Sequence, residues 1–374
     1  MNFVCTKENL SHALEIVSGI AGKHINLPIL SNILIKAENA KVELVATNLE
    51  IASKAVLRAK VEEKGAFTIP AKTLLDYVKL LPEEQIKIKK EKNEIIIECA
   101  GSRTKIKGEE AEDFPIIPEV EEKHAFVLDA KELKNSLSQV VFASAKNEIR
   151  PELSGVLFSF FSDNYKGLVL AATDSYRLAE KKIQTKQGQD QINIILPARS
   201  VYEIIRLLSI GLTKETENNV RMWVGENQFA IRYNDFEIIS KLIDGKYPDY
   251  GQIIPETFKT TAPVNKDIFI NKIKAASLFT SGGANAVSFD LSSEQKELSV
   301  SSISSQTGEH SSSIDSDVEG EENSILLNHR YVLDGLQNIE NQEIEFKVNS
   351  SDSPCLLSGK NETDYLYIVM PIRK

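Results

Sequence analysis

The fold is decided by the stretch 3–10 (FVCTKENL), which recurs at 126–133 (FVLDAKEL) and, more weakly, at 261–268 (TAPVNKDI). In each copy an apolar strand end passes through a short polar cap into the first turn of an amphipathic helix. Successive copies are separated by the length of a compact domain. The repeat therefore predicts three similar domains.

A second pattern lies between these copies. It stands at 69–75 (IPAKTLL), 196–202 (LPARSVY) and 327–333 (LNHRYVL), about midway through each third of the chain. Pro suits the first turn of a helix, because its missing N–H would have no partner there. Each domain is therefore expected to hold two copies of one unit. The expected domain boundaries are 1–122, 123–256 and 257–374.

Every copy carries one helix with a single apolar stripe, which is typical of a helix that lies on another element. The stripes are Leu10, Leu14 and Val17; Leu74, Val78 and Leu81; Leu133, Leu137 and Val140; Val201, Ile205 and Leu208; Ile268, Ile273 and Ala276; and Val332, Leu336 and Ile339. Short strands such as 42–46 (VELVA) and 343–348 (EIEFKV) stand between the helices. The fold class is therefore α+β, with antiparallel sheets and helices packed on one face.

Composition also marks the connecting segments. A charged break at 119–123 (EVEEK) precedes the second domain, and a Pro-marked break at 254–258 (IPETF) precedes the third. The stretch 299–316 is rich in Ser, and a disordered linker is one interpretation of it. It occupies the same repeat position as 44–55 and 170–181, which favours a polar strand and turn.

Several classes of protein are excluded by the sequence. No apolar run approaches the eighteen or so residues of a membrane span, and the N-terminus lacks the charged-then-apolar pattern of a signal peptide. The cysteines have no paired spacing, which fits a reducing cytoplasm better than a disulfide framework or a zinc site. They are Cys5, Cys99 and Cys355.

Recognisable catalytic chemistry is also missing from the sequence. The scattered histidines, His12, His24, His124, His310 and His329, form no metal-ligand spacing. There is no Gly-x-Ser-x-Gly elbow or dinucleotide fingerprint, and the turn 281–284 (SGGA) lacks the Lys-Ser or Lys-Thr of a phosphate loop. We therefore expect no catalytic residue, no metal and no cofactor.

The net charge of −10 argues against DNA binding when it is taken alone, because affinity for DNA comes largely from Lys and Arg. The distribution of charge changes that interpretation. The six expected helices hold eleven Lys or Arg and seven Asp or Glu, so they are net positive while the rest of the chain is strongly negative. This pattern suggests a weakly basic helical lining inside an acidic shell.

Helix dimensions limit the assembly that could use such a lining. A packed helix is about 10 Å across, so six helices side by side in a closed circle leave a hole of roughly 9 Å. Twelve helices leave a hole of about 28 Å. Duplex DNA is about 20 Å wide, so that two chains could encircle it and one could not.

Four motifs in order resemble one family over essentially the whole chain. They are 27–32 (LPILSN), 173–179 (TDSYRLA), 244–250 (DGKYPDY) and 369–373 (VMPIR). The family is the bacterial sliding clamp, the beta subunit of DNA polymerase III. The resemblance implies a non-catalytic processivity factor, a homodimer closed head to tail around duplex DNA without regard to sequence.

The resemblance also implies a hydrophobic cleft that receives a short peptide from the DNA polymerase III alpha subunit, the clamp loader, other polymerases and repair proteins. By motif, its walls would be Leu153, Thr173, Tyr176, Arg177, Leu178, Pro248, Ile253, Asn328, Tyr331, Met370, Pro371 and Ile372. Arg177 could reach a peptide carbonyl or carboxylate. The alternative, that these residues belong to the core, applies best to Leu178 and Thr173.

Further residues follow from the same resemblance. DNA contacts would come from Lys23, His24, Lys72, Lys79, Asn147, Arg150 and Arg199. The seam between subunits would place Thr104 and Ile106 against Leu278 and Phe279. The chain departs from the usual pattern at His24, where an Arg commonly touches DNA, at Gln252, where a basic residue is common, and at its last residues, 372–374.

Two other hypotheses remain at this stage. A repeat scaffold could present a peptide groove without binding DNA, and it would be a compact monomer with no hole. A hydrolase with an unrecognised site would lose activity on a single polar substitution.

Overall fold

The structure, a computed structural model, describes residues 1–22, 27–147, 149–212, 218–280, 283 and 285–373. It divides into two compact units. Unit 1 comprises Met1–Lys134, Thr185–Asp190 and Arg199–Leu242, and unit 2 comprises Asn135–Gln184, Gln191–Ala198 and Ile243–Lys374. None of the described helices is both long and apolar enough to cross a membrane.

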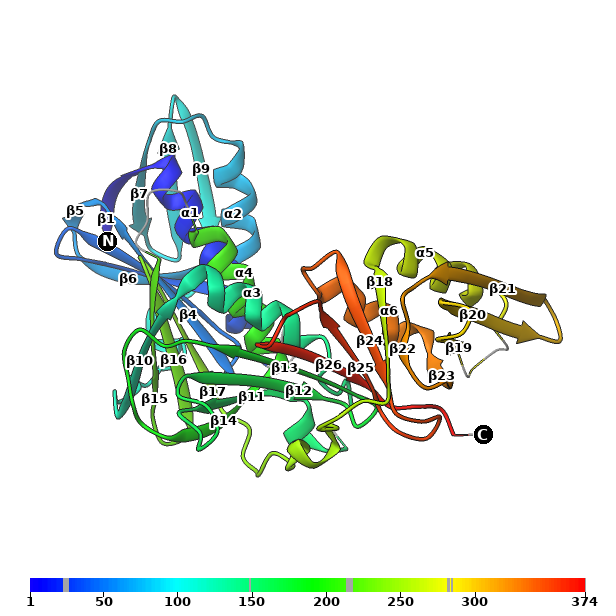
Figure 1. Cartoon of the computed structure of the whole chain (residues 1–374). Helices are drawn as coiled ribbons and strands as arrows, with labels where there is room; N and C mark the ends of the chain where they lie inside the picture. Colours follow the sequence, from blue (N-terminus) through cyan, green and yellow to red (C-terminus); the bar gives the residue numbers. More distant parts are fainter. Residues whose placement is uncertain (23–26, 148, 213–217, 281–282, 284, 374) are drawn as a thin grey trace. The chain divides into compact units, whose positions relative to one another are not determined.

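Unit 1 contains two antiparallel sheets (Figure 1). The first has the order β5 (Lys60–Glu63), β1 (Asn2–Thr6), β7 (Gln85–Glu91), β8 (Glu94–Cys99), β9 (Ser102–Lys107). The second has the order β10 (His124–Asp129), β15 (Asn219–Val224), β16 (Gln228–Tyr233), β17 (Phe236–Lys241), β4 (Ile51–Arg58), β3 (Lys41–Thr47), β2 (Asn32–Glu38), β6 (Gly65–Pro70). We call the pairing of β17 with β4 the first junction.

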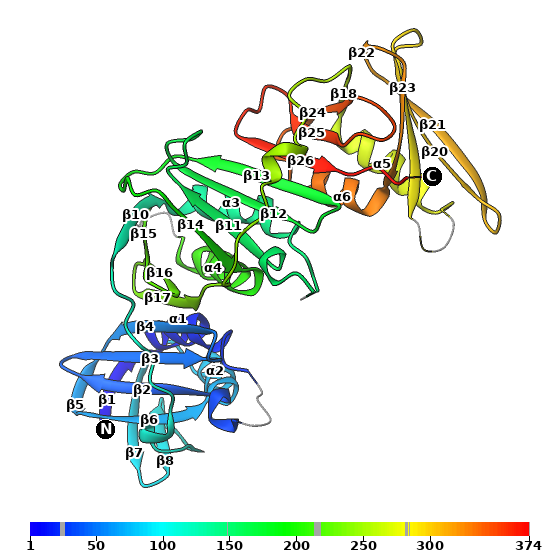
Figure 2. The same cartoon turned by 90° about the horizontal axis from the view of Figure 1, so that it is seen from below.

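Unit 2 contains two further antiparallel sheets, seen from below in Figure 2. The larger has the order β14 (Ile192–Pro197), β11 (Gly155–Phe160), β12 (Leu168–Thr173), β13 (Arg177–Ile183), β26 (Tyr365–Val369), β25 (Cys355–Gly359), β24 (Glu343–Val348), β18 (Thr260–Asn265), β22 (Glu319–Gly320). The smaller has the order β21 (Gly308–Asp315), β20 (Glu297–Ser304), β19 (Ala286–Ser292), β23 (Asn323–Asn328). The pairing of β13 with β26 is the second junction.

The repeated strand-to-helix motif forms as expected. The described residues form the helices α1 (Lys7–Ser18), α2 (Ala71–Leu80), α3 (Ala130–Val141), α4 (Ala198–Gly211), α5 (Lys266–Ser277) and α6 (His329–Asn338). The polar residue of each first-pattern copy caps its helix, because its side-chain oxygen accepts backbone N–H groups of the first turn. Thr6 accepts from Asn9, Asp129 from Lys131 and Glu132, and Asn265 from Asp267 and Ile268.

Three details of the helix predictions were wrong. Ile268 is 48% exposed, and the buried residue at this turn of α5 is Phe269. Likewise α4 buries Ile204, whereas Ile205 is only half-buried. A spacing of five, as between Ile268 and Ile273, does not keep two side chains on one face of a helix with 3.6 residues per turn. In addition, Pro70 and Pro197 stand just before α2 and α4, not in their first turns.

The Ser-rich stretch forms strands, as its position in the repeat indicated. Leu298, Val300 and Ile314 of β20 and β21 point into the core, and serines alternate with them. The expected connectors 119–123 and 254–258 contain neither helix nor strand. The expected domain boundaries stay predictions.

Candidate functional site

The turn between β12 and β13 is fixed by its own side chains. The Thr173 hydroxyl donates to the carbonyl of Arg177 at 2.7 Å and accepts from the N–H of Ser175 at 3.2 Å. The Asp174 carboxylate accepts from the N–H groups of Tyr176 and Arg177 at 3.0 and 3.1 Å. Such side-chain bonds replace backbone partners in tight turns. They hold Tyr176 outward, where it is 62% exposed.

The exposed Tyr176 stacks against an aromatic residue of α6. The ring centroids of Tyr176 and Tyr331 are 6.3 Å apart, with an interplanar angle of 20°. Asn328 caps α6 by accepting the N–H of Arg330 at 3.0 Å, and the Tyr367 hydroxyl donates to the Tyr331 carbonyl at 2.8 Å. An aromatic pair is therefore presented by two elements that are distant in sequence.

Arg177 lies beneath this pair and is only 5% exposed. Its guanidinium donates to Asp174 at 3.0 Å, to Asp334 at 2.5 Å and to the carbonyl of Phe142 at 3.0 Å. Burial alone would lower the pKa of this guanidinium, but contacts with Tyr367, Asp334 and Asp174 raise it above the ordinary value. Arg177 is therefore a fixed cation whose three nitrogens all have protein partners.

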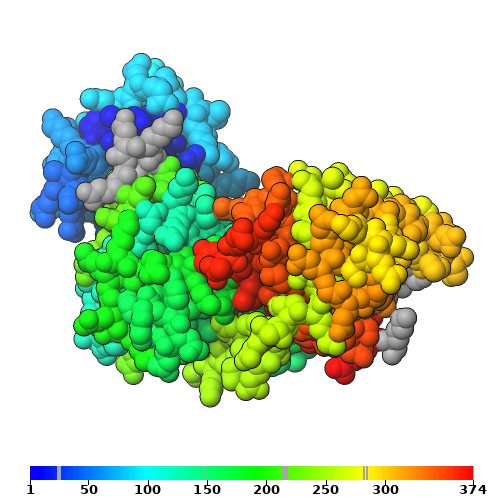
Figure 3. All heavy atoms as spheres, in the orientation of Figure 1, coloured from blue at the N-terminus to red at the C-terminus, as the bar shows by residue number. Residues whose placement is uncertain are grey.

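The residues after β26 lie beside the same turn. The N–H of Met370 donates to the Tyr176 carbonyl at 2.9 Å, and the N–H of Ile372 donates to the Leu326 carbonyl of β23 at 2.8 Å. Met370, Pro371 and Ile372 are half-buried. Atoms near the end of the chain, drawn red, reach the face shown in Figure 3. This segment adds apolar side chains next to the aromatic pair.

The other expected wall residues divide into core and surface. Leu153, Thr173 and Leu178 are buried, and the hydroxyl of Tyr247 accepts the N–H of Thr173 at 3.1 Å. Pro248 is half-buried, and Ile253 is 38% exposed at the end of the short 3-10 helix Tyr250–Ile253.

All twelve expected wall residues lie within unit 2, and the turn, α6 and the last residues are joined by hydrogen bonds. Sequence reasoning missed the residues that hold them. Asp174 stands inside a motif already noted, and its Asp-Ser step was a turn signal. Asp334, Phe142 and Leu326 gave no such signal, because their contacts are made only by the tertiary fold.

The expected DNA contacts fall in both units. Lys23 and His24 lie outside the described residues. Lys72 and Arg199 are exposed in the first turns of α2 and α4, while Lys79 pairs with Glu15 of α1 at 2.9 Å. In unit 2, Asn147 and Arg150 are exposed, and Arg150 pairs with Glu152 at 2.9 Å.

The expected seam residues lie beside edge strands. Thr104 and Ile106 belong to β9, which pairs only with β8 in its sheet. Thr104 is half-exposed, whereas the Ile106 side chain is 7% exposed and faces the core. Leu278 is 71% exposed, and Phe279 stacks on His310 of the edge strand β21 at 5.7 Å.

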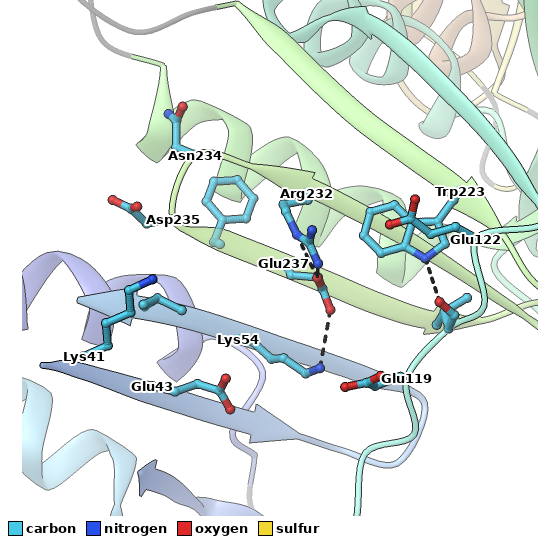
Figure 4. Close-up of a pocket in the computed structure, with 13 residues that line it drawn as sticks. Lys41, Glu43, Lys54, Glu119, Glu122, Trp223, Arg232, Asn234, Asp235 and Glu237 are labelled. Carbon is cyan, nitrogen blue, oxygen red and sulfur yellow. Dashed lines mark hydrogen bonds and ion pairs between the residues drawn. The ribbon is translucent and has the colours of Figure 1, made fainter. Parts of the chain in front are cut away.

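A polar hollow of about 620 Å³ lies in unit 1 over β3, β4, β16 and β17 (Figure 4). Glu237 accepts from Arg232 at 3.0 Å and pairs with Lys54 at 3.4 Å. The Trp223 indole donates to the Val120 carbonyl at 3.0 Å, which fixes the connector 119–123 beside the sheet. The single Glu237 carboxylate is thus shared by two cations of the same sheet.

No cluster of three His, Cys, Asp or Glu suited to a metal occurs among the residues that the structure describes. The three cysteines are buried, and burial raises the pKa of the Cys5 and Cys355 thiols to about 12. Thiols of such high pKa are poor nucleophiles.

Comparison with known proteins covers the whole chain. Family models of the DNA polymerase III beta subunit match in order, the N-terminal domain at residues 1–118, the central domain at 127–249 and the C-terminal domain at 251–373. The beta sliding clamp of Staphylococcus epidermidis is 28% identical over 383 residues, covering 100% of this chain and 99% of its own.

Solved structures agree with the sequence match. The DNA polymerase III beta subunit of Pseudomonas aeruginosa has a TM-score of 0.93 at 26% identity, covering 100% of both chains. The sliding clamp of Bacillus subtilis has a TM-score of 0.92 at 27% identity, covering 100% of this chain and 99% of its own. A Pseudomonas aeruginosa sliding clamp bound to griselimycin also has a TM-score of 0.93 at 26% identity, again over 100% of both chains. This chain, with its three repeated domains and its antiparallel sheets, belongs to the DNA polymerase III beta subunit family, the sliding clamps.

Proposed function

We propose that two copies of this chain close head to tail around duplex DNA and hold the replicative polymerase on it. The observation that carries this proposal is the full-length match, in order, to three clamp domains. The proposed domains are 1–122, 123–256 and 257–374, and the proposed compartment is the cytoplasm. The chain acts as a processivity factor without catalysis of its own, so the purified protein is expected to turn over no substrate.

DNA is held by enclosure, with weak contacts from Lys23, His24, Lys72, Lys79, Asn147, Arg150 and Arg199. The net charge of −10 supports this arrangement, because a ring that slides must not grip phosphates strongly. The test compares retention of the protein, after loading, on closed circular DNA and on the same DNA cut once. Rapid loss from the cut DNA is expected, and equal retention on both would rule out enclosure.

The subunit seam joins the edge strand β9 to the edge strand β21, with Leu278 and Phe279 beside it. Edge strands carry unpaired backbone groups that can pair with another chain, and Leu278 is 71% exposed. Scattering or electron microscopy of the purified protein should show a dimer with a hole wide enough for a duplex. A compact monomer without a hole would favour the scaffold alternative.

Partner peptides from the DNA polymerase III alpha subunit, the clamp loader, other polymerases and repair proteins bind the surface formed by Tyr176, Tyr331 and residues 370–372. The stack of the exposed Tyr176 on the half-buried Tyr331 and the apolar end segment support this proposal, since aromatic anchors dominate binding surfaces. The griselimycin complex of the Pseudomonas aeruginosa relative supplies a probe for this chain.

Deletion of residues 370–374 is the direct experiment. It should abolish polymerase stimulation and griselimycin binding while leaving the dimer intact. If the dimer is lost instead, the partner surface has been assigned to the wrong part of the chain. The full-length chain carrying Arg373→Ala, which keeps residues 370–372, serves as the matched control.

A further inference from the structure

One side chain connects three parts of the partner surface. Arg177 donates to Asp174 in the turn, to Asp334 of α6 and to the Phe142 carbonyl just after α3. Its guanidinium carbon also lies 4.8 Å from the centre of the Tyr331 ring and 5.5 Å from that of Phe142. A cation this close to an aromatic face attracts it, more strongly where water is excluded.

We propose that Arg177 and Asp334 are positioning residues that orient the Tyr331 ring for a partner peptide and do not contact the peptide themselves. This inference rests on the proposed function, because it concerns the same surface. It differs from the expectation that Arg177 reaches a peptide carbonyl or carboxylate.

The hydrogen bonds leave Arg177 little freedom to reach a ligand. All three guanidinium nitrogens donate within the protein, and the residue is 5% exposed. Because its side chain is only 4% exposed, Arg177 would have to leave Asp174 or Asp334 in order to reach a peptide. The pair with Asp174 is largely buried, since the Asp174 side chain is 15% exposed, and a single new hydrogen bond to a ligand does not repay the breaking of such a pair.

Tyr331, by contrast, depends on this cation for its orientation. One neighbour of the ring is Arg177, and another is Tyr176, which is 62% exposed. Asp334 follows Tyr331 by three residues, so the two side chains lie one turn apart on the same face of α6. Both of them contact Arg177. Removing the Asp334 carboxylate therefore releases the cation that the ring packs on, although Asp334 need not touch the ligand.

Two explanations of Arg177 predict opposite results for Asp334→Ala. If Arg177 binds the peptide directly, loss of Asp334 frees a donor and binding is unchanged or tighter. If Arg177 positions Tyr331, binding weakens. Asp334 has a half-exposed side chain on α6, so this substitution is compatible with folding.

The experiment measures griselimycin affinity of the full-length chain by calorimetry. We expect Asp334→Ala to weaken binding roughly tenfold, with partial recovery in Asp334→Asn, which keeps an acceptor. In a Tyr331→Ala background the same Asp334→Ala change should alter affinity by less than about twofold, because residues that act through one another are not additive. Unchanged or tighter binding by Asp334→Ala, or full additivity with Tyr331→Ala, would overturn the proposal.

Arg206→Lys is the control. Arg206 is a half-buried arginine that donates to the Glu203 carboxylate and to two carbonyls of α1, but it lies in unit 1. It should leave griselimycin affinity unchanged.

A crystal structure of Asp334→Ala without ligand supplies a second, independent result. We expect the Tyr331 ring to leave its stack with Tyr176, and retention of that stack would overturn the inference. If the unaltered chain fails to bind griselimycin, that result counts against the proposed peptide surface, and the crystal structure decides the role of Arg177 and Asp334 by itself.

Discussion

The two junctions use the same backbone turn with different side chains. At the first junction the Thr47 hydroxyl donates to the Ile51 carbonyl at 2.9 Å, and Asn48 accepts from the N–H groups of Glu50 and Ile51 at 3.0 and 2.8 Å. At the second junction Thr173 and Asp174 make the same bonds to Tyr176 and Arg177. Leu49 and Ser175 hold the same left-handed position, with φ of 73° and 77°.

The chain that follows each junction repeats as well. At the first, the N–H of Lys241 donates to the Glu50 carbonyl at 2.9 Å. At the second, the N–H of Met370 donates to the Tyr176 carbonyl at the same distance. The two junctions thus share one backbone arrangement. Tyr176 stands at the second junction where Glu50 stands at the first, and Met370 stands where Lys241 does. The difference shows that the repeat builds the turn twice, and that side chains alone make the second copy the more apolar one.

The helix ends beside the two junctions are capped by different groups. In unit 1, Arg206 donates to the carbonyls of Glu15 and Ile16 near the end of α1, at 2.9 and 2.8 Å. In unit 2, the Tyr365 hydroxyl donates to the Gln139 carbonyl of α3 at 3.1 Å, and Arg177 donates to Phe142. In the second arrangement the arginine packs against the ring of Tyr331, which stacks on the exposed Tyr176.

The largest expected effect comes from giving the second turn the side chains of the first. Tyr176→Glu combined with Met370→Lys should weaken griselimycin binding at least about a hundredfold, because two apolar anchors become charges. Calorimetry measures the affinity. Glu50→Gln with Lys241→Gln, the corresponding change at the first junction, should leave it unaltered. A similar loss of griselimycin affinity in both double variants would mean that the ligand does not distinguish the second junction from the first.

A smaller effect is expected from the cap of the first junction. Arg206→Ala removes the donors to Glu15 and Ile16 and leaves Glu203 without its partner. The free energy of unfolding should fall by about 2 kcal/mol, as measured by urea denaturation. Griselimycin affinity should not change, and a parallel loss of affinity would show that unit 1 influences the partner surface.

The shared threonine of the two turns separates stability from binding. Thr47→Val and Thr173→Val each remove hydroxyl bonds within a buried turn and should each cost about 1 kcal/mol of unfolding free energy. Only Thr173→Val should also weaken griselimycin binding, because its turn carries Tyr176. Equal binding by both variants would show that the turn need not be rigid for the ligand.

The smallest expected effect is a pH dependence confined to the second junction. His329 is 8% exposed at the start of α6, where burial and, secondarily, Arg330 lower the pKa of its imidazole below 6.5. The folded state therefore binds this proton less readily than the unfolded state. The stabilisation is complete above the ordinary pKa and is lost as pH falls through the lowered one.

Urea denaturation between pH 8 and 5, a range of about three units around the ordinary value, measures this dependence. His329→Gln should reduce the slope of stability against pH. Ala198 stands at the corresponding position of α4, so the first junction has no counterpart. An unchanged slope in His329→Gln would assign the dependence to other groups.

The Ser-rich stretch shows where composition alone misleads. In unit 1, Leu34 pairs with Val45 and both pack against Phe114 of the following connector. The corresponding pair in β19 and β20 is Ser288 with Ser301. Apolar residues are needed where a connector covers the outer face of a sheet. Serine suffices where that face remains partly accessible to solvent, as it does at Ser288 and Ser301. Composition could not distinguish Ser-rich strands from a disordered linker, whereas the position of the stretch in the repeat could.

The sequence by itself determined the repeat and the helix starts, and it predicted the residues of the proposed partner surface. Local rules suffice for these, since caps, turn side chains and hydrophobic period act over a few residues. Local rules failed in detail at Ile268, where Phe269 is the buried residue, because a spacing of five was accepted without regard to the helical period.

Only the tertiary structure decided how those residues are held. Arg177 and Asp334 are 157 residues apart in the sequence. Ile372 contacts Leu326 through a backbone hydrogen bond, which no side-chain pattern could have predicted. Long-range contacts depend on which strands pair, and strand pairing is set by packing over the whole unit. The motif predicted Arg177 as a residue of the partner surface, and the fold determined that its nitrogens donate within the protein.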